Sequence, residues 1–219
     1  MLIDTDSHYI VLKSGIGEYE EKKSKFLAKT YYISSDDEVT DILETVRKKY
    51  YDARHNCYAY KIGKNGDNIK LSDDGEPSQT AGRPIMDIIG GRNIFNILIV
   101  VTRYFGGVKL GTGGLARAYS EAARRAIDNS EIAKTVTGCP YKISVDYSNG
   151  SAIENYFRKN DIYIERISYT DNETFSTMIP DINVEQTRKD LMEILSTSEV
   201  PQAMASVTYV IQDGSLRIL

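Results

Sequence analysis

The stretch "VVTRYFGGVKLGTGGLARAY" (residues 100–119) joins sequence typical of a strand, a loop and a helix. Its apolar start belongs to "NILIVVTRY", a β-branched run from residue 96 that predicts a buried strand. Glycines and basic residues follow, and a helix is predicted from Gly113 or Gly114 to about Asn129. This strand, loop and helix therefore organise the first part of the chain.

The surrounding sequence predicts an α+β domain. Four further segments are typical of strands: "HYIVLKS", "KFLAKTYYI", "HNCYAYKI" and "DNIKLSD". Helices are expected over residues 36–50 and 81–89, and this mixture favours a sheet with its helices on one face. The charged run "EYEEKKSK" is expected to be a solvated surface.

A second domain is predicted after the breaker cluster Gly138-Cys139-Pro140, which gives domains of residues 1–137 and 138–219. The segments "YKISVDY", "GSAIENYFRKN", "IYIERISY", "ETFSTMIP", a helix over about residues 183–195, and "MASVTYVI" follow in that order. They predict the order β-α-β-β-α-β, which is typical of ferredoxin-like folds. That fold carries many functions and identifies none of them.

Composition bounds the class of protein. The chain has 219 residues, of which 41% are hydrophobic and 26% charged, as in ordinary globular proteins. No apolar stretch approaches the roughly 20 residues of a membrane helix, and the start "MLIDTDSHYI" does not resemble a signal peptide, so a cytoplasmic protein is expected. The net charge of −4 argues against a surface covered in positive charge. The acidic excess lies from Gly138 onward, which leaves the first domain free to present a basic surface.

The glycine loop has the elements of an anion site. Glycines let the backbone approach another group closely, and a helix N-terminus offers unpaired N–H groups. The residues predicted to form this site are Arg103, Gly106, Gly107, Lys109, Gly111, Gly113 and Arg117. The alternative is that the glycines serve only a tight turn and helix packing. A nucleotide cofactor is not expected, because the spacing fits neither a Walker loop nor an immediate Rossmann turn.

The acidic segment "LSDDGEPSQTAGRP" (residues 71–84) has two interpretations. Asp73, Asp74 and Glu76 could bind a divalent ion or act as acid and base. The alternative is a turn in which Ser78 or Thr80 caps the next helix, and the residues favour this second interpretation. No metal site is therefore predicted.

The strand "HNCYAYKI" offers two further possibilities. His55 and Cys57 share one face, which places a potential base beside a potential nucleophile, although such a cysteine is usually a small buried residue. Arg54 precedes Tyr58 and Tyr60, and a basic residue beside exposed aromatics could bind phosphate and stack bases. Tyrosines on a strand equally pack against a helix. No catalytic residue is assigned.

The motifs "DDGEPSQTAGRPI" and "VVTRYFGGVKLGTGGLARAY", in this order, resemble the signature of the YigZ/IMPACT family. The resemblance implies a first domain similar to the second domain of a small-subunit ribosomal protein and to a domain of elongation factor G. It implies a second, ferredoxin-like domain, as in bacterial members. Eukaryotic members of the family regulate translation in amino-acid starvation signalling. The resemblance supplies no accepted catalytic residue and no cofactor.

Three functions follow as hypotheses. The first is a non-enzymatic regulator, linked to translation and stress, that presents Arg54, Arg103, Lys109 and Arg117 to RNA, the ribosome or a translation-related protein. The second is a hydrolase-type enzyme for a small anion, which requires the acidic segment and the glycine loop to line one pocket. The third is a protein-interaction module that uses the acidic second domain.

Overall fold

The computed structural model describes residues 8–63, 66–196, 205–212 and 215–218 of a mixed α/β protein. The chain divides into two compact units between Lys134 and Thr135, whereas the sequence pattern predicts a boundary at Gly138. The cluster Gly138-Cys139-Pro140 lies inside strand β8 (Val136–Val145). A Cβ at Gly138 would lie 2.6 Å from the carbonyl oxygen of Ile179, so this glycine marks a close approach of two strands rather than a linker.

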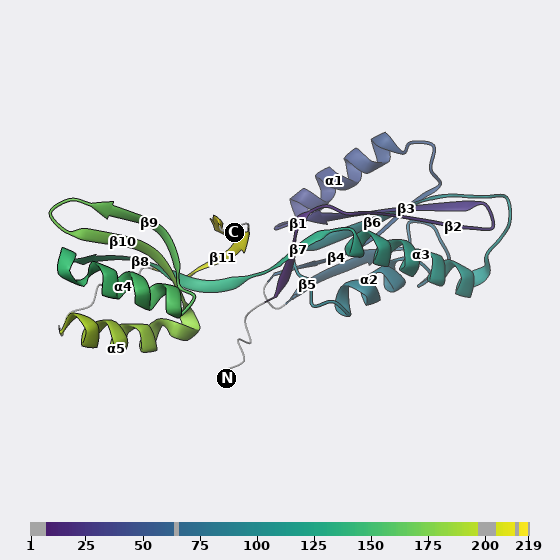
Figure 1. Cartoon of the computed structure of the whole chain (residues 1–219). Helices are drawn as coiled ribbons and strands as arrows, with labels where there is room; N and C mark the ends of the chain where they lie inside the picture. The colour runs from purple at the N-terminus through teal and green to yellow at the C-terminus, as the bar shows by residue number, and fades with distance from the viewer. Residues whose placement is uncertain (1–7, 64–65, 197–204, 213–214, 219) are drawn as a thin grey trace. The chain divides into compact units, whose positions relative to one another are not determined.

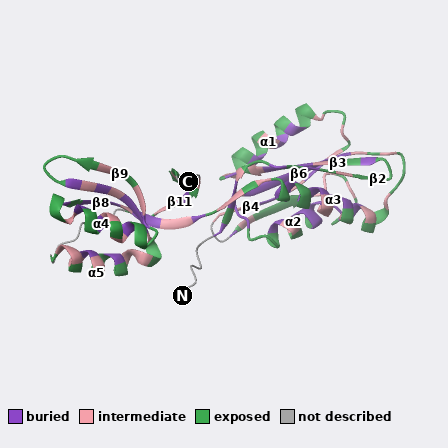
Figure 2. Cartoon of the chain, in the orientation of Figure 1, coloured by how far each residue is buried: buried purple, intermediate pink, exposed green. Residues whose placement is uncertain are grey.

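The N-terminal unit is built on a five-stranded antiparallel sheet. Its order is β2 (Ile16–Glu21), β3 (Ser24–Tyr32), β6 (Ile97–Tyr104), β4 (His55–Ile62) and β5 (Asn68–Ser72). The central strand β6 is buried on both sides, as Figure 2 shows. Ile97, Ile99 and Val101 enter one core, and Leu98 and Val100 enter another. The buried strand predicted from "NILIVVTRY" is therefore present, in the middle of the sheet.

Helices cover both faces of this sheet, so the expectation of helices on one face is wrong (Figure 1). Helix α1 (Asp36–Lys49) packs on one face through Val39, Leu43 and Val46. Helices α2 (Gly82–Gly90) and α3 (Gly111–Asp128) pack on the opposite face. The physical reason is β6, because a strand that is apolar on both sides needs a cover on each.

Two strands of the N-terminal unit escape prediction from the sequence. Strand β2 contains the first half of the charged run "EYEEKKSK", and Lys22 and Lys23 form its turn into β3 with positive φ angles of 47° and 66°. Strand β7 (Glu131–Lys134) pairs with β1 (Tyr9–Lys13), more than a hundred residues earlier. A local sequence pattern does not reveal such strands, because β2 carries solvated charges and β7 pairs with a strand far away in the sequence.

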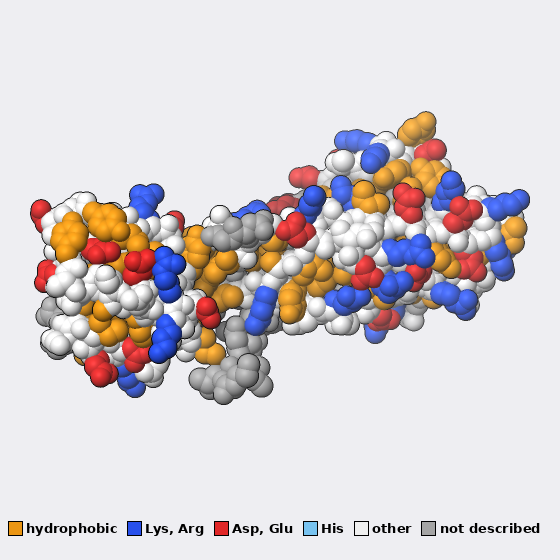
Figure 3. Space-filling view, viewed as in Figure 1, with side chains coloured by type: hydrophobic (Ala, Val, Ile, Leu, Met, Phe, Trp, Pro, Cys, Tyr) orange, Lys and Arg blue, Asp and Glu red, His pale blue; other side chains and the backbone are white. Residues whose placement is uncertain are grey.

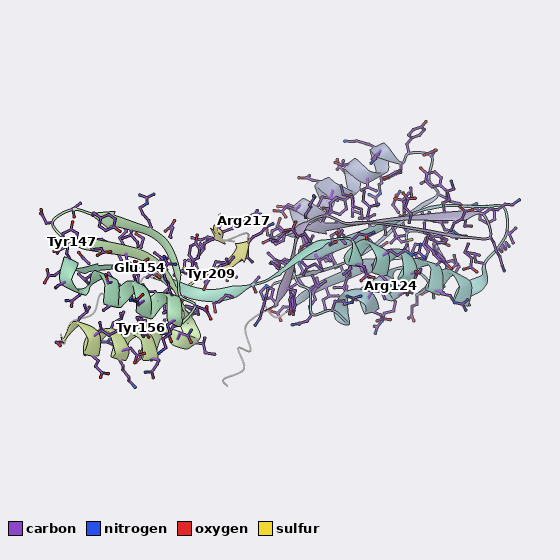
Figure 4. All side chains as sticks on the ribbon, in the orientation of Figure 1. Arg124, Tyr147, Glu154, Tyr156, Tyr209 and Arg217 are labelled. Atoms are coloured by element: carbon purple, nitrogen blue, oxygen red, sulfur yellow. The ribbon has the colours of Figure 1, made fainter. Side chains whose placement is uncertain are left out.

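The C-terminal unit has its own sheet and core. The sheet order is β12 (Ser215–Ile218), β11 (Val207–Gln212), β8, β10 (Glu173–Pro180) and β9 (Tyr163–Tyr169). Helices α4 (Tyr147–Lys159) and α5 (Val184–Leu195) supply Phe157 and Leu191 to the core, next to Phe175 of the sheet. The Tyr156 hydroxyl of α4, labelled in Figure 4, donates a 2.8 Å hydrogen bond to Asp190 of α5. Strand β12 was not predicted, and Met204 of the segment "MASVTYVI" lies outside the described residues.

Candidate functional site

A cavity of about 450 Å³ lies in the N-terminal unit, where the end of β6, the acidic segment and the start of α3 meet. Its walls are residues 54–55, 75–77 and 109–112, together with Arg103, Phe105 and Leu115. The volume is within the range of small-molecule sites. The acidic segment and the glycine loop, which the sequence leaves as separate motifs, therefore line one cavity.

The glycines of the loop fall into two groups. A Cβ at Gly106 would lie 2.1 Å from the backbone carbon of Lys23, and Gly107 and Gly111 have positive φ angles of 86° and 74°. These three glycines are required by the fold. Gly113 lies in the first turn of α3, and a Cβ there would meet nothing within 4 Å. The fold gives no reason for a glycine at position 113.

The four predicted cations have different surroundings. Arg54 and Lys109 are exposed and line the cavity, whereas Arg117 is exposed farther along α3 and is not part of the cavity wall. Among the residues that the structure describes, these three form no ion pair, unlike Arg124 of the same helix, which pairs with Glu121 and Asp128 (Figure 4). Figure 3 shows such cations and carboxylates interspersed over the surface around α3. Arg54 and Lys109 are therefore the cavity's accessible positive charges.

Arg103 differs from the expectation of a residue that faces solvent, because its side chain is only 6% exposed. Its Nη1 donates to Oε1 of Glu76 at 2.5 Å, and the Glu76 side chain is itself 4% exposed. The same carboxylate oxygen accepts a 2.8 Å hydrogen bond from the Tyr119 hydroxyl and lies 3.9 Å from Nε2 of His55. The Arg103 charge is thus partly neutralised at the back of the cavity.

Asp73 and Asp74 organise the backbone of the acidic segment. One oxygen of Asp73 accepts the N–H groups of Ala81 and Gly82 at 2.9 and 2.8 Å, at the start of α2. Asp73 therefore does the capping that the sequence pattern assigns to Ser78 or Thr80. Asp74 accepts the N–H of Asn56 at 2.7 Å. Within the described ranges, no group of three or more His, Cys, Asp or Glu side chains is arranged to hold a metal ion.

His55 and Cys57 lie on one face of β4, as the alternation predicts, but the thiol is not activated. The Cys57 Sγ lies 3.0 Å from the carbonyl oxygen of Asp73 and 3.2 Å from the Tyr119 hydroxyl, either of which can accept its one S–H, and burial raises the pKa of the thiol well above its usual value. The thiol therefore stays protonated and weakly nucleophilic. His55 Nδ1 lies 2.7 Å from the Asp74 carbonyl oxygen, which can only accept, so Nδ1 carries the proton.

The tyrosines of β4 do not form an exposed platform. Tyr60 is 2% exposed and Tyr58 is half-buried, and both belong to the core that α1 covers. An exposed aromatic residue lies instead at Phe105, which lines the cavity beside Arg103 and was not singled out from the sequence. Its position next to the glycine loop, directly after β6, is the signal that could have identified it.

The cavity lies within a region that matches a known family. The family model of the Impact N-terminal domain matches residues 22–127, which include every residue of the cavity wall.

No helix of the described residues is long and apolar enough to span a bilayer.

Relatives and one solved structure match beyond that domain. The IMPACT family member YvyE of Bacillus subtilis is 35% identical over 173 residues, which cover 79% of this chain and 80% of YvyE. The IMPACT family member YigZ of Escherichia coli is 35% identical over 62% of this chain and 67% of YigZ. A crystal structure of a hypothetical protein aligns with a TM-score of 0.60 and 27% identity over 98% of this chain and 97% of that one. The chain therefore belongs to the IMPACT family.

Proposed function

We propose that this protein is a non-enzymatic regulator linked to translation, and that its N-terminal unit binds RNA phosphate through the cavity. The family resemblance supports the link to translation, because eukaryotic members are translational regulators. One observation carries the assignment of RNA: Arg54 and Lys109 line the cavity beside the N-terminus of α3 without an ion-pair partner among the described residues, in a chain whose net charge is −4. The proposed partners are RNA, the ribosome or a translation-related protein, in the cytoplasm.

The physical basis is the combination of the positive end of helix α3 with the positively charged side chains near it. The first turn of a helix presents N–H groups without intrahelical partners and the positive end of the helix dipole. Residues 109–112 bring this end of α3 to the cavity wall, next to Lys109. Arg117 is exposed farther along α3, outside the cavity wall, and would add a further contact to an extended strand of RNA. Arg103 contributes less, because Glu76 pairs with it.

Sedimentation with ribosomes at low and moderate salt tests this function. Wild type is compared with the Arg54→Ala, Lys109→Ala double variant and with a control, Lys48→Ala, Lys159→Ala, which removes the same charge from exposed sites outside the cavity. Each lost phosphate contact reduces the slope of log affinity against log salt by roughly 0.7–0.9. We expect salt-sensitive binding that the double variant loses and the control keeps. Salt-independent binding, or equal loss in both variants, would contradict the proposal.

A second candidate, a hydrolase-type enzyme for a small anion, is favoured by one observation. The buried Glu76 and the Nε2 of His55 lie 3.9 Å apart in the same cavity as the basic loop, as an acid and base pair would. Hydrolysis of p-nitrophenyl phosphate by wild type and by His55→Asn tests it. Turnover that falls at least about a hundredfold in His55→Asn would support the enzyme, and equal rates would exclude it.

We further infer a ferredoxin-like fold for the C-terminal unit, and for the N-terminal unit a fold similar to the second domain of a small-subunit ribosomal protein. The order β8-α4-β9-β10-α5-β11, with antiparallel neighbours in the order β11-β8-β10-β9, supports the first assignment. The second rests on the family resemblance. Superposition of each unit on representatives of those folds tests both assignments, and a different strand order in the matched cores would refute them.

A further inference from the structure

Gly113 is a residue that neither backbone conformation nor packing explains. It lies in the first turn of α3, directly after Thr112 of the cavity wall, and a Cβ would project into open space. Glycine is less favourable than alanine in a helix, so a protein gains stability by replacing it unless something else needs the space. A ligand that approaches the exposed backbone N–H groups of this turn would need that space.

Arg103 supplies a second, independent observation that points to a ligand in the same cavity. Its side chain is 94% buried in the cavity wall, and within the described part of the chain its Nε has no hydrogen-bond partner. A buried guanidinium N–H without an acceptor is costly, and such groups are nearly always paired. In this structure the protein itself covers the Nε, so an oxygen-rich anion in the cavity would supply the missing acceptor after a small shift of the Arg103 side chain.

The charges of the wall favour a dianion. Arg54, Arg103 and Lys109 are positive and Glu76 is negative, which leaves two positive charges next to the positive end of α3. A phosphomonoester carries between about 1.5 and 2 negative charges at neutral pH, whereas each internal phosphate of a nucleic acid carries one.

Phe105 adds an aromatic surface to this anion site. Its side chain is 46% exposed at the cavity wall, and the guanidinium of Arg103 lies over the ring with its Cζ 5.7 Å from the centroid. An exposed aromatic ring beside a phosphate site provides a stacking surface for a nucleobase.

We propose that the cavity binds the phosphomonoester of a nucleotide, either free or at the end of an RNA, with the base stacked on Phe105. The phosphate lies against the first turn of α3, between Lys109 and Arg54, and accepts from the Nε of Arg103. Gly113, which follows Thr112 of the wall, carries no side chain over the backbone of this turn. This inference rests on the proposed function and narrows it, from phosphate along a strand to a terminal phosphate.

Fluorescence anisotropy tests the proposal with one RNA oligonucleotide prepared in two forms. One form carries a 5′-phosphate and the other a 5′-hydroxyl. Nucleoside 5′-monophosphate, the nucleoside alone and orthophosphate are used as competitors, to distinguish a free nucleotide from an RNA end. We expect the phosphorylated RNA and the monophosphate to bind at least about tenfold more tightly than their hydroxyl counterparts. Equal affinity of the two RNA forms, with no competition by the monophosphate, would overturn the proposal.

Substitutions at Phe105 and Gly113 assign the two parts of the site. Phe105→Leu is expected to lower affinity for the monophosphate by about tenfold and to leave orthophosphate affinity unchanged, whereas Phe105→Tyr keeps both. Gly113→Val adds a side chain to the first turn of α3, next to Thr112 of the wall, and is expected to weaken binding of all phosphates while the protein remains folded by circular dichroism. Unchanged binding in both Phe105→Leu and Gly113→Val would overturn the proposal.

Ribosome sedimentation tests the proposed function, and the comparison of RNA ends tests the terminal-phosphate site, so the two proposals can be rejected independently. Salt-sensitive ribosome binding without discrimination between RNA ends would reject the terminal-phosphate site and keep the proposed function. Discrimination between the RNA ends without ribosome binding would keep the site and reject the ribosome as its partner.

Discussion

Replacement of Arg103 by leucine leaves the Glu76 carboxylate buried without its cation. Because one member of a buried ion pair is then uncompensated, we expect Arg103→Leu to lower the free energy of unfolding by about 3–5 kcal/mol, as measured by urea denaturation. Lys109→Ala at the exposed mouth of the same cavity is expected to change it by less than about 0.5 kcal/mol.

The double variant Arg103→Leu, Glu76→Leu checks the cause of this loss. It removes the uncompensated charge, so it is expected to be more stable than Arg103→Leu alone. A double variant that is less stable than the single one would show that packing of the arginine stem, rather than its charge, dominates.

Two glycines of one loop are expected to respond in opposite directions to the same substitution. Gly113→Ala should raise the free energy of unfolding by about 0.5–1 kcal/mol, because alanine is favoured in helices and the new Cβ meets nothing within 4 Å. Gly106→Ala should lower it, because that Cβ would collide with the backbone of Lys23. Thermal denaturation of both variants provides the measurement. A destabilised Gly113→Ala protein would mean that the fold requires this glycine after all.

At the residue scale, the sequence predicts part of the cavity. The glycine loop and Lys109 were identified because helix N-termini and glycines have local signatures. The pairing of Arg103 with Glu76 was not, since it depends on the register that sets His55 opposite Arg103 and on the path of the acidic segment. Such contacts join residues of three separate elements, and no local pattern records them.

At the scale of elements, Asp36 fastens the start of α1 to strands β4 and β5. Its carboxylate accepts hydrogen bonds from the Tyr60 hydroxyl and the Asn68 amide, and Lys70 lies 3.5 Å away. The hydrogen bond from Tyr60, followed by that from Asn68, holds the pKa of Asp36 below its ordinary value of 3.8. A lowered folded pKa stabilises the protein above the unfolded value and loses that contribution as the pH falls through the folded one.

Acid titration of the melting temperature tests this attachment of α1. We expect wild type to melt above Asp36→Asn at neutral pH, by a margin that stays constant down to about pH 5 and shrinks below pH 4. Asp41→Asn, on the exposed side of the same helix, serves as the control and should melt in parallel with wild type. A margin that does not change with pH would contradict an ionised Asp36 as the source of the stability.

The elements that could be predicted are those with a strong local pattern. Helix α1 has the capping residue Ser35, whose side chain accepts the N–H of Glu38, and β6 is a continuous apolar run. Strands β2, β7 and β12 could not be predicted, because half of the residues of β2 are charged and the other two strands have four residues each. A short or charged strand is stabilised by its partners, which lie elsewhere in the chain.

For the whole molecule, the cores determine how the chain unfolds. The two clusters of the N-terminal unit draw all their buried residues from Val11 to Ile127, and the cluster of the C-terminal unit draws its own from Cys139 to Leu191. Each unit therefore buries its apolar side chains by itself. The predicted order of elements indicates two units, and the breaker cluster used to place their boundary lies inside strand β8, where Gly138 serves strand pairing.

Separate cores imply separate stabilities, which a cavity-forming substitution can test. Ile153 of α4 is fully buried among Phe157 and Phe175, so Ile153→Ala should destabilise the C-terminal unit by about 2–5 kcal/mol. Amide hydrogen exchange should then accelerate in β8 and β10 and stay unchanged in β6, since no residue of the N-terminal cores is altered. The reciprocal variant Ile99→Ala should accelerate exchange in β6 and its neighbours β3 and β4, and leave β8 and β10 unchanged. Equal acceleration in both units by either variant would show that the chain unfolds as one cooperative body, whose stability depends on both cores together.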